Sequence, residues 1–166
     1  VAAVANKLTA AIFSSSVNTG TFVVTSHATG NEVATAVVAG TLNAATSVTL
    51  TGSATAVATL EIQGTGTSAL TDVTLDDVTG LTTLTLNSTN GVMTVTGAID
   101  GASNGEGTLT IHDDDAGAAG DLVTVGRAVG ANNNLLALNV GSTTTAGNAK
   151  FTGAVEAATI KIFGGD

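Results

Sequence analysis

Hydrophobic residues alternate with small polar ones through most of the chain, most clearly between residues 70 and 99. Val73 and Leu75 fall on one side of an extended segment, and Thr74 and Asp76 fall on the other. This period of two, in runs rich in β-branched residues, predicts β-strands because successive side chains of a strand point to opposite faces. Similar runs are centred near residues 49, 61, 85, 94, 110, 124, 137 and 161.

Turn-forming residues separate these runs, among them Thr79-Gly80 and Asn90-Gly91. The runs recur about every 12 residues, a cadence typical of a repeated β architecture. Two architectures share it. An antiparallel β-sandwich or jelly roll places a turn roughly every 8–12 residues, whereas a parallel β-solenoid lays down about two strands per coil of roughly 20–25 residues.

Composition favours the solenoid. The 166 residues include no Pro, Cys, Trp or Tyr and only four Phe. Aromatic side chains, which bury about 150–250 Å² each, therefore contribute little, and the core must be narrow enough for small aliphatic residues to fill. Thr and Asn recur at similar places, where stacked coils would align them into ladders. We predict an all-β parallel β-solenoid, with the antiparallel β-sandwich or jelly roll as the alternative.

The beginning of the chain carries its one helical signal. Val1, Val4, Leu8 and Ile12 recur at three- and four-residue steps, so residues 1–13 are expected to form a short amphipathic helix. We accordingly expect residues 1–20 to be an N-terminal cap or assembly segment and residues 21–166 to be the β-repeat domain. The segment either covers the end of its own fold or completes the sheet of a neighbour, and the pattern leaves both open.

Acidic residues outnumber basic ones, 13 to 4, which gives a net charge of −9. This charge repels phosphate backbones and the chain lacks aromatic platforms for bases, so we expect no nucleic-acid partner. No apolar run of about 18 residues exists, and no transmembrane segment is expected. The absence of Cys in a Thr-, Asn- and Gly-rich chain is typical of bacterial or archaeal surface proteins without disulfides, which predicts an extracellular or cell-surface location.

The densest charge lies at Asp113, Asp114 and Asp115, with Asp121 a few residues later. Clustered carboxylates are hard oxygen ligands of the kind that Ca²⁺ takes, with backbone carbonyls completing the shell. The spacing matches neither the EF-hand loop nor the calcium-binding nonapeptide of solenoids. These four residues are the candidate metal ligands, with Ca²⁺ as the possible cofactor, and a solvated acidic turn is the alternative.

No catalytic centre is visible, and we expect the protein not to be an enzyme. His27 and His112 could act as catalytic bases, but the sequence has no Gly-x-Ser-x-Gly motif to supply a nucleophilic serine. Residues 64–69 formally fit a dinucleotide-binding fingerprint, but a strand pattern rather than a helix follows them. Asn87-Ser88-Thr89 fits the N-glycosylation acceptor pattern at an accessible strand end, or is a chance match in a Thr-rich chain.

Several segments resemble repeats of bacterial surface proteins. Residues 95–111 (VTGAIDGASNGEGTLTI), 120–142 (GDLVTVGRAVGANNNLLALNVGS) and 148–165 (NAKFTGAVEAATIKIFGG) are similar to repeats in the passenger regions of large rickettsial outer-membrane autotransporters. Residues 80–89 (GLTTLTLNST) are similar to runs in Thr/Ala-rich bacterial S-layer proteins. The likeness is one of repeat style, and it implies a β-helical segment exposed on a cell surface.

A stack of coils leaves two open ends, each a template for pairing with another copy unless it is capped. We therefore expect an extracellular structural protein that self-assembles into a surface layer, filament or stalk, with copies of itself as partners. The alternative is an adhesin or autotransporter-type passenger segment that presents loops to a host or cell-surface partner.

Overall fold

The fold is an all-β parallel solenoid, as the sequence predicts, and the antiparallel alternative is wrong. The computed structural model describes residues 9–26, 32–53, 55–77, 81–89, 91–113 and 121–164, and these contain no helix. Every strand pair among them is parallel. Their fifteen strands are β1 (Thr9–Phe13), β2 (Val17–Thr25), β3 (Ala34–Val38), β4 (Leu42–Thr51), β5 (Ala58–Gln63), β6 (Gly66–Ser68), β7 (Asp72–Asp76), β8 (Thr82–Ser88), β9 (Val92–Val95), β10 (Ala98–Gly101), β11 (Glu106–Asp113), β12 (Leu122–Val125), β13 (Leu135–Val140), β14 (Ala149–Phe151) and β15 (Ala157–Ile162).

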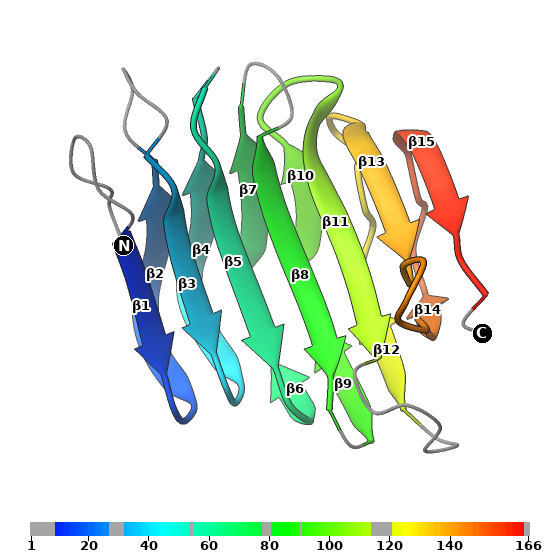
Figure 1. Ribbon diagram of the computed structural model, residues 1–166, viewed down its shortest axis with the longest axis horizontal. Helices are drawn as coiled ribbons and strands as arrows, with labels where there is room; N and C mark the ends of the chain where they lie inside the picture. The colour runs from blue at the N-terminus through cyan, green and yellow to red at the C-terminus, as the bar shows by residue number, and fades with distance from the viewer. Residues whose placement is uncertain are drawn as a thin grey trace.

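The strands form one long sheet and two shorter ones (Figure 1). The long sheet has the order β1-β3-β5-β8-β11-β13-β15, and the four-stranded sheets have the orders β10-β7-β4-β2 and β14-β12-β9-β6. Partner residues in successive strands of the long sheet are separated by 25, 24, 24, 25, 29 and 22 residues. Each coil therefore adds one strand to the long sheet and returns through the shorter ones.

The central coils have three strands, not the two that the cadence suggests. After β8 the chain forms β9 and β10, which are only four residues each, before it re-enters the long sheet as β11. Gly97 occupies the corner between β9 and β10, where a Cβ atom would lie 2.5 Å from the carbonyl oxygen of Leu70. Two short strands joined by one tight corner look like a single run in the sequence.

The core consists of side chains stacked in register between the sheets. Along the long sheet, Leu60, Leu84 and Leu109 are fully buried and lie directly above one another. A neighbouring column is formed in the same way by Val38, Ile62, Leu86 and Ile111. In the middle of the long sheet, large aliphatic residues thus meet similar ones from the next coil, and these columns contain no aromatic residue.

Residues 9–13 form β1, so the expected helix over residues 1–13 is wrong for this part. Ile12 points outward and is 76% exposed, while Phe13 packs against the core and meets Phe22 edge-to-face at 5.9 Å between ring centroids. Parallel pairing with β3 stabilises the extended form, because the interior of a solenoid end demands alternation rather than a helical stripe. Val1, Val4 and Leu8 lie outside the described residues, and β2 runs across residue 20, the expected domain boundary.

Candidate functional site: a threonine face and two open ends

The four predicted metal ligands lie in the sequence between the end of β11 and the start of β12. Asp113 is the last residue of β11, and its backbone N–H donates to the carbonyl oxygen of Ala146 at 2.9 Å. Asp121 immediately precedes β12 and is only 3% exposed. Asp114 and Asp115 lie outside the described residues.

Asp121 binds backbone rather than a cluster of acids. Its Oδ1 accepts a hydrogen bond from the backbone N–H of Gly91, and its own carbonyl oxygen accepts one from Nδ2 of Asn148 at 2.8 Å. Its Oδ2 is buried without a hydrogen-bond partner. Within the described ranges no three His, Cys, Asp or Glu side chains are close enough to hold a metal ion. Through these hydrogen bonds Asp121 connects the turns of three successive coils.

Asp77 also binds a backbone N–H, and the sequence analysis predicted this structural role for neither Asp77 nor Asp121. It is buried, and its Oδ2 accepts a hydrogen bond from the backbone N–H of Leu81. A buried carboxylate is stabilised by backbone donors of this kind, because each N–H offsets part of the lost hydration. In the sequence, the signal for this role is an Asp next to a turn. Exposed acidic loops show the same signal, so the pattern does not distinguish the two.

Asn87 is not accessible, contrary to the expectation for a glycosylation site. It is only 1% exposed and lies between Gln63 and His112 in the register of the long sheet. Its Nδ2 donates to Oε1 of Glu61 at 3.1 Å, and the same oxygen accepts from Nε2 of Gln63 at 2.9 Å. The amide is therefore engaged in a side-chain network at the strand ends.

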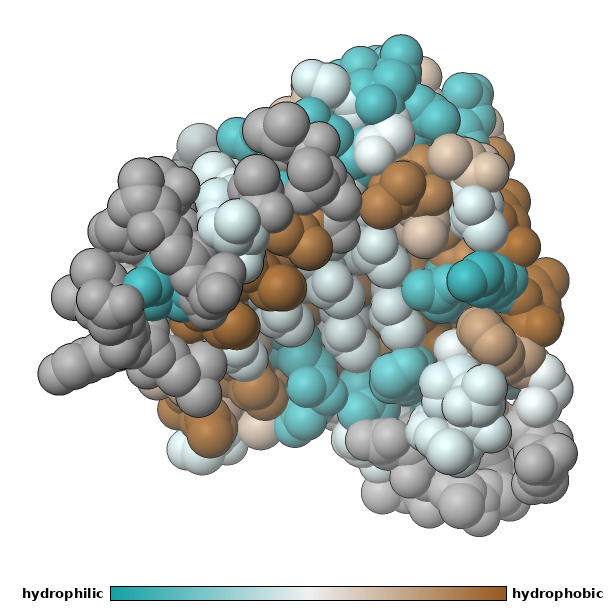
Figure 2. Space-filling view, turned by 45° about the horizontal axis from the view of Figure 1, so that its top comes forward, coloured by the Kyte–Doolittle hydropathy of each residue, from teal (hydrophilic) through white to brown (hydrophobic). Residues whose placement is uncertain are grey.

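The outer surface of the long sheet carries two ladders of residues in register, which we call the threonine face. Figure 2 shows pale side chains in neighbouring rows near the centre of this surface. The first ladder comprises Ala10, Thr35, Thr59, Thr83, Thr108, Ala137 and Thr159. The second comprises Ile12, Val37, Glu61, Thr85, Thr110, Asn139 and Lys161.

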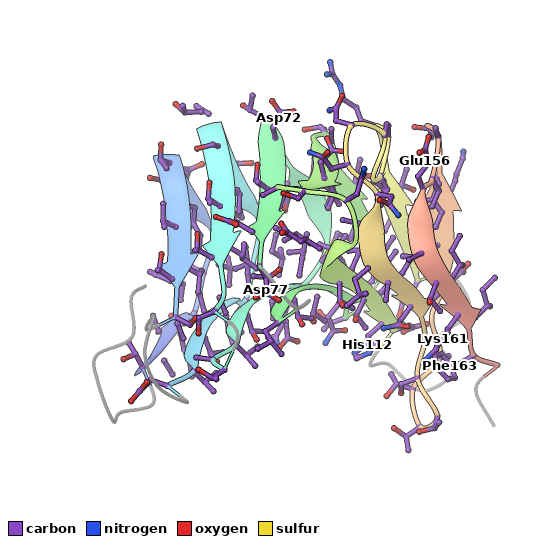
Figure 3. All side chains as sticks on the ribbon, turned by 90° about the horizontal axis from the view of Figure 1, so that it is seen from above. Asp72, Asp77, His112, Glu156, Lys161 and Phe163 are labelled. Carbon is purple, nitrogen blue, oxygen red and sulfur yellow. The ribbon has the colours of Figure 1, made fainter. Side chains whose placement is uncertain are left out.

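Acidic residues gather elsewhere. Asp72, Asp76 and Asp100 belong to the sheet β10-β7-β4-β2, where they alternate with the buried residues of their strands. Figure 3 shows Asp72 on the opposite side of the molecule from His112 and Lys161, which belong to the long sheet. Each of the two threonine-face ladders is therefore nearly neutral, although the chain carries a net charge of −9.

The last coil leaves part of the core columns uncovered. Ile160 stacks on Leu138 and Ile162 stacks on Val140, yet these isoleucines are 51% and 78% exposed. β15 is the end strand of the long sheet and pairs only with β13 among the described strands. This end, which we call the β15 end, exposes both apolar side chains and an unpaired backbone edge.

No known protein family, curated protein or solved structure matches this chain. No helix among the described residues is long and apolar enough to cross a membrane.

Proposed function

We propose that the protein is an extracellular structural subunit that self-assembles end to end, building a filament, stalk or surface layer. The observation that carries the proposal is the β15 end, where the core columns continue to the surface and stop uncovered. An unpaired parallel strand with apolar side chains is a template for another strand of the same geometry.

The other end strand of the long sheet is β1, which is similar to β15 in length. β1 has five residues and β15 has six, and both lie at the two ends of the same sheet. Extending the register of the sheet places Ile160 over Ala11 of a second copy and Ile162 over its Phe13. Each inward position of one end thus meets an inward position of the other, so the core columns run on from copy to copy.

The apolar contribution to this contact follows from the exposure of the two isoleucines. Full burial of such a side chain is worth about 1.5–3 kcal/mol. Covering the exposed fractions, 51% of Ile160 and 78% of Ile162, therefore contributes about 2–4 kcal/mol before any strand pairing. Like charges oppose this gain, because each copy carries −9. Assembly should consequently strengthen as salt screens the repulsion over about 10 Å at 0.1 M.

The proposal can be tested by cross-linking, since the chain has no native cysteine. Lys161 and Ile12 point outward and become neighbours across the junction, so Ile12→Cys with Lys161→Cys leaves the apolar contact intact. Adjacent strands lie about 4.8 Å apart, within the Cα separation of about 4.4–6.8 Å that a disulfide spans. Mild oxidation should give a ladder of dimers, trimers and longer species.

The matched control is Ala10→Cys with Lys161→Cys. Ala10 also points outward, but it is offset from Ile12 by two residues, or about 6.6 Å, along β1, so its Cα lies about 8 Å from that of residue 161 and out of disulfide range. The control pair should give no ladder. Equal ladders for both pairs, or monomers for both at every concentration and salt, would refute end-to-end assembly.

A further inference from the structure

The threonine face has a regularity that end-to-end assembly does not use. Thr59, Thr83 and Thr108 are register partners in three consecutive strands, and Thr85 and Thr110 repeat the arrangement two residues further along β8 and β11. Within the described residues, the hydroxyl groups of these five threonines make no hydrogen bond to another protein group. From these features we propose that the threonine face binds the surface of ice.

The spacing of the hydroxyl groups follows from the parallel pairing. Strands in register repeat about every 4.8 Å across the sheet, and outward residues repeat about every 6.6 Å along a strand. The array is thus two-dimensional and nearly rectangular. Water oxygens on the prism planes of hexagonal ice repeat at comparable distances in two perpendicular directions, so a row of hydroxyls can take the places of lattice waters.

The threonines are also held in place before any ligand arrives. Their side chains are half-buried against one another along the ladder, and a β-branched residue has few χ1 rotamers. An ordered array loses little conformational entropy when it binds an ordered partner. Each Thr presents a methyl group beside its hydroxyl, and this combination favours water ordered around the face over water bound at single points.

Charge distribution favours a neutral lattice over a protein or an ion as the occupant. The acidic residues Asp72, Asp76 and Asp100 belong to another sheet, and the one basic residue in the two ladders is Lys161. Glu61 is the one acid in the two ladders, and its Oε1 is occupied by Gln63 and Asn87. The outward positions of β8 and β11 in these ladders carry no large apolar or aromatic anchor, which protein interfaces concentrate at their centre.

The test compares ice growth in the presence of the native chain and of two matched double variants. Thr83→Lys with Thr110→Lys places two long charged side chains on the threonine face. The control is Thr49→Lys with Thr74→Lys, because these threonines are register partners, half-buried and outward-facing on the sheet β10-β7-β4-β2. Both variants change the net charge equally, and circular dichroism with thermal melts verifies that each is folded.

Ice crystals in the presence of the native protein should grow faceted, and recrystallisation should be inhibited. The control variant should keep this activity and the threonine-face variant should lose it. The single variant Thr85→Lys supplies the same comparison if the double variant does not fold. Ice growth equal to that in serum albumin at the same concentration, or equal loss of activity in both Lys variants, would overturn the proposal. Cross-linking at the β15 end is a separate readout, so either proposal can fail alone.

Discussion

The substitution Leu84→Ala removes the central side chain of one of the core columns of the long sheet. Leu84 is fully buried and lies between Leu60 and Leu109, which belong to the coils on either side. Large-to-small changes at such sites cost about 2–5 kcal/mol, and the cost grows with the cavity that remains. We expect a loss near 3–4 kcal/mol, because hydrogen-bonded parallel strands hold the neighbours apart and limit collapse into the space.

Ile160→Ala is the matched comparison at the end of the same column. Ile160 stacks on Leu138 but is 51% exposed, and no coil covers it. Its truncation leaves no closed cavity and removes only part of the burial free energy, so the expected loss is about 1 kcal/mol. The same chemistry should therefore differ about threefold in effect between the middle and the end of one column.

Urea unfolding followed by far-UV circular dichroism measures both losses. The chain has no Trp or Tyr, so intrinsic fluorescence is not a useful probe. The midpoint and the slope are fitted together, because a changed slope signals loss of cooperativity between coils, as quasi-one-dimensional folds allow. Equal losses of stability for Leu84→Ala and Ile160→Ala, measured at a concentration where the protein is monomeric, would refute the continuous column.

Three further predictions concern two glycines, the candidate metal ligands and Asn87. Gly130→Ala should destabilise the protein more than Gly105→Ala, although both glycines have positive φ. A Cβ atom at Gly130 would lie 2.0 Å from the carbonyl oxygen of Glu156, whereas a Cβ atom at Gly105 meets nothing within 4 Å. Equal melting temperatures of the two variants would contradict this. Ca²⁺ should raise the melting temperature of the native chain, as a ligand that binds only the native state does. It should not raise the melting temperature of a triple variant with Asp113→Asn, Asp115→Asn and Asp121→Asn. Identical melting curves of the native chain with and without Ca²⁺ would refute the metal-site hypothesis. Expression in a glycosylating host should leave Asn87 unmodified in the folded protein, since its amide is buried and bonded to Glu61, and a glycan found there by mass spectrometry would contradict it.

Alternation was enough to predict the long sheet and its core. The columns through Leu84 and Leu86 follow from period two and from the need to bury aliphatic residues without aromatics. The expected ladders of polar residues also form, since Nδ2 of Asn43 donates to Oδ1 of Asn18 in the neighbouring coil at 2.8 Å. The register that aligns the threonines could not be predicted in this way. It depends on the number of residues in each coil, which depends on the conformation of the corners, and composition alone does not determine that conformation.

The failures of sequence reasoning have a common physical origin. Residues 9–13 carry a helical spacing, yet pairing with β3 overrides it. Asn87 was expected to be accessible at the end of a strand, yet Gln63 and His112 from adjacent coils flank it. In each case a contact about 25 residues away in the chain decides the outcome, and local patterns do not contain such contacts.

Electron microscopy of the purified protein at increasing concentration and salt can show whether copies stack end to end. Seven strands of the long sheet, at about 4.8 Å each, predict an axial repeat of about 34 Å per copy in an end-to-end stack. We expect filaments with this repeat and with strands perpendicular to the filament axis. Particles that stay single at every concentration, or assemblies in which copies meet through the faces of the sheets without this repeat, would contradict the account.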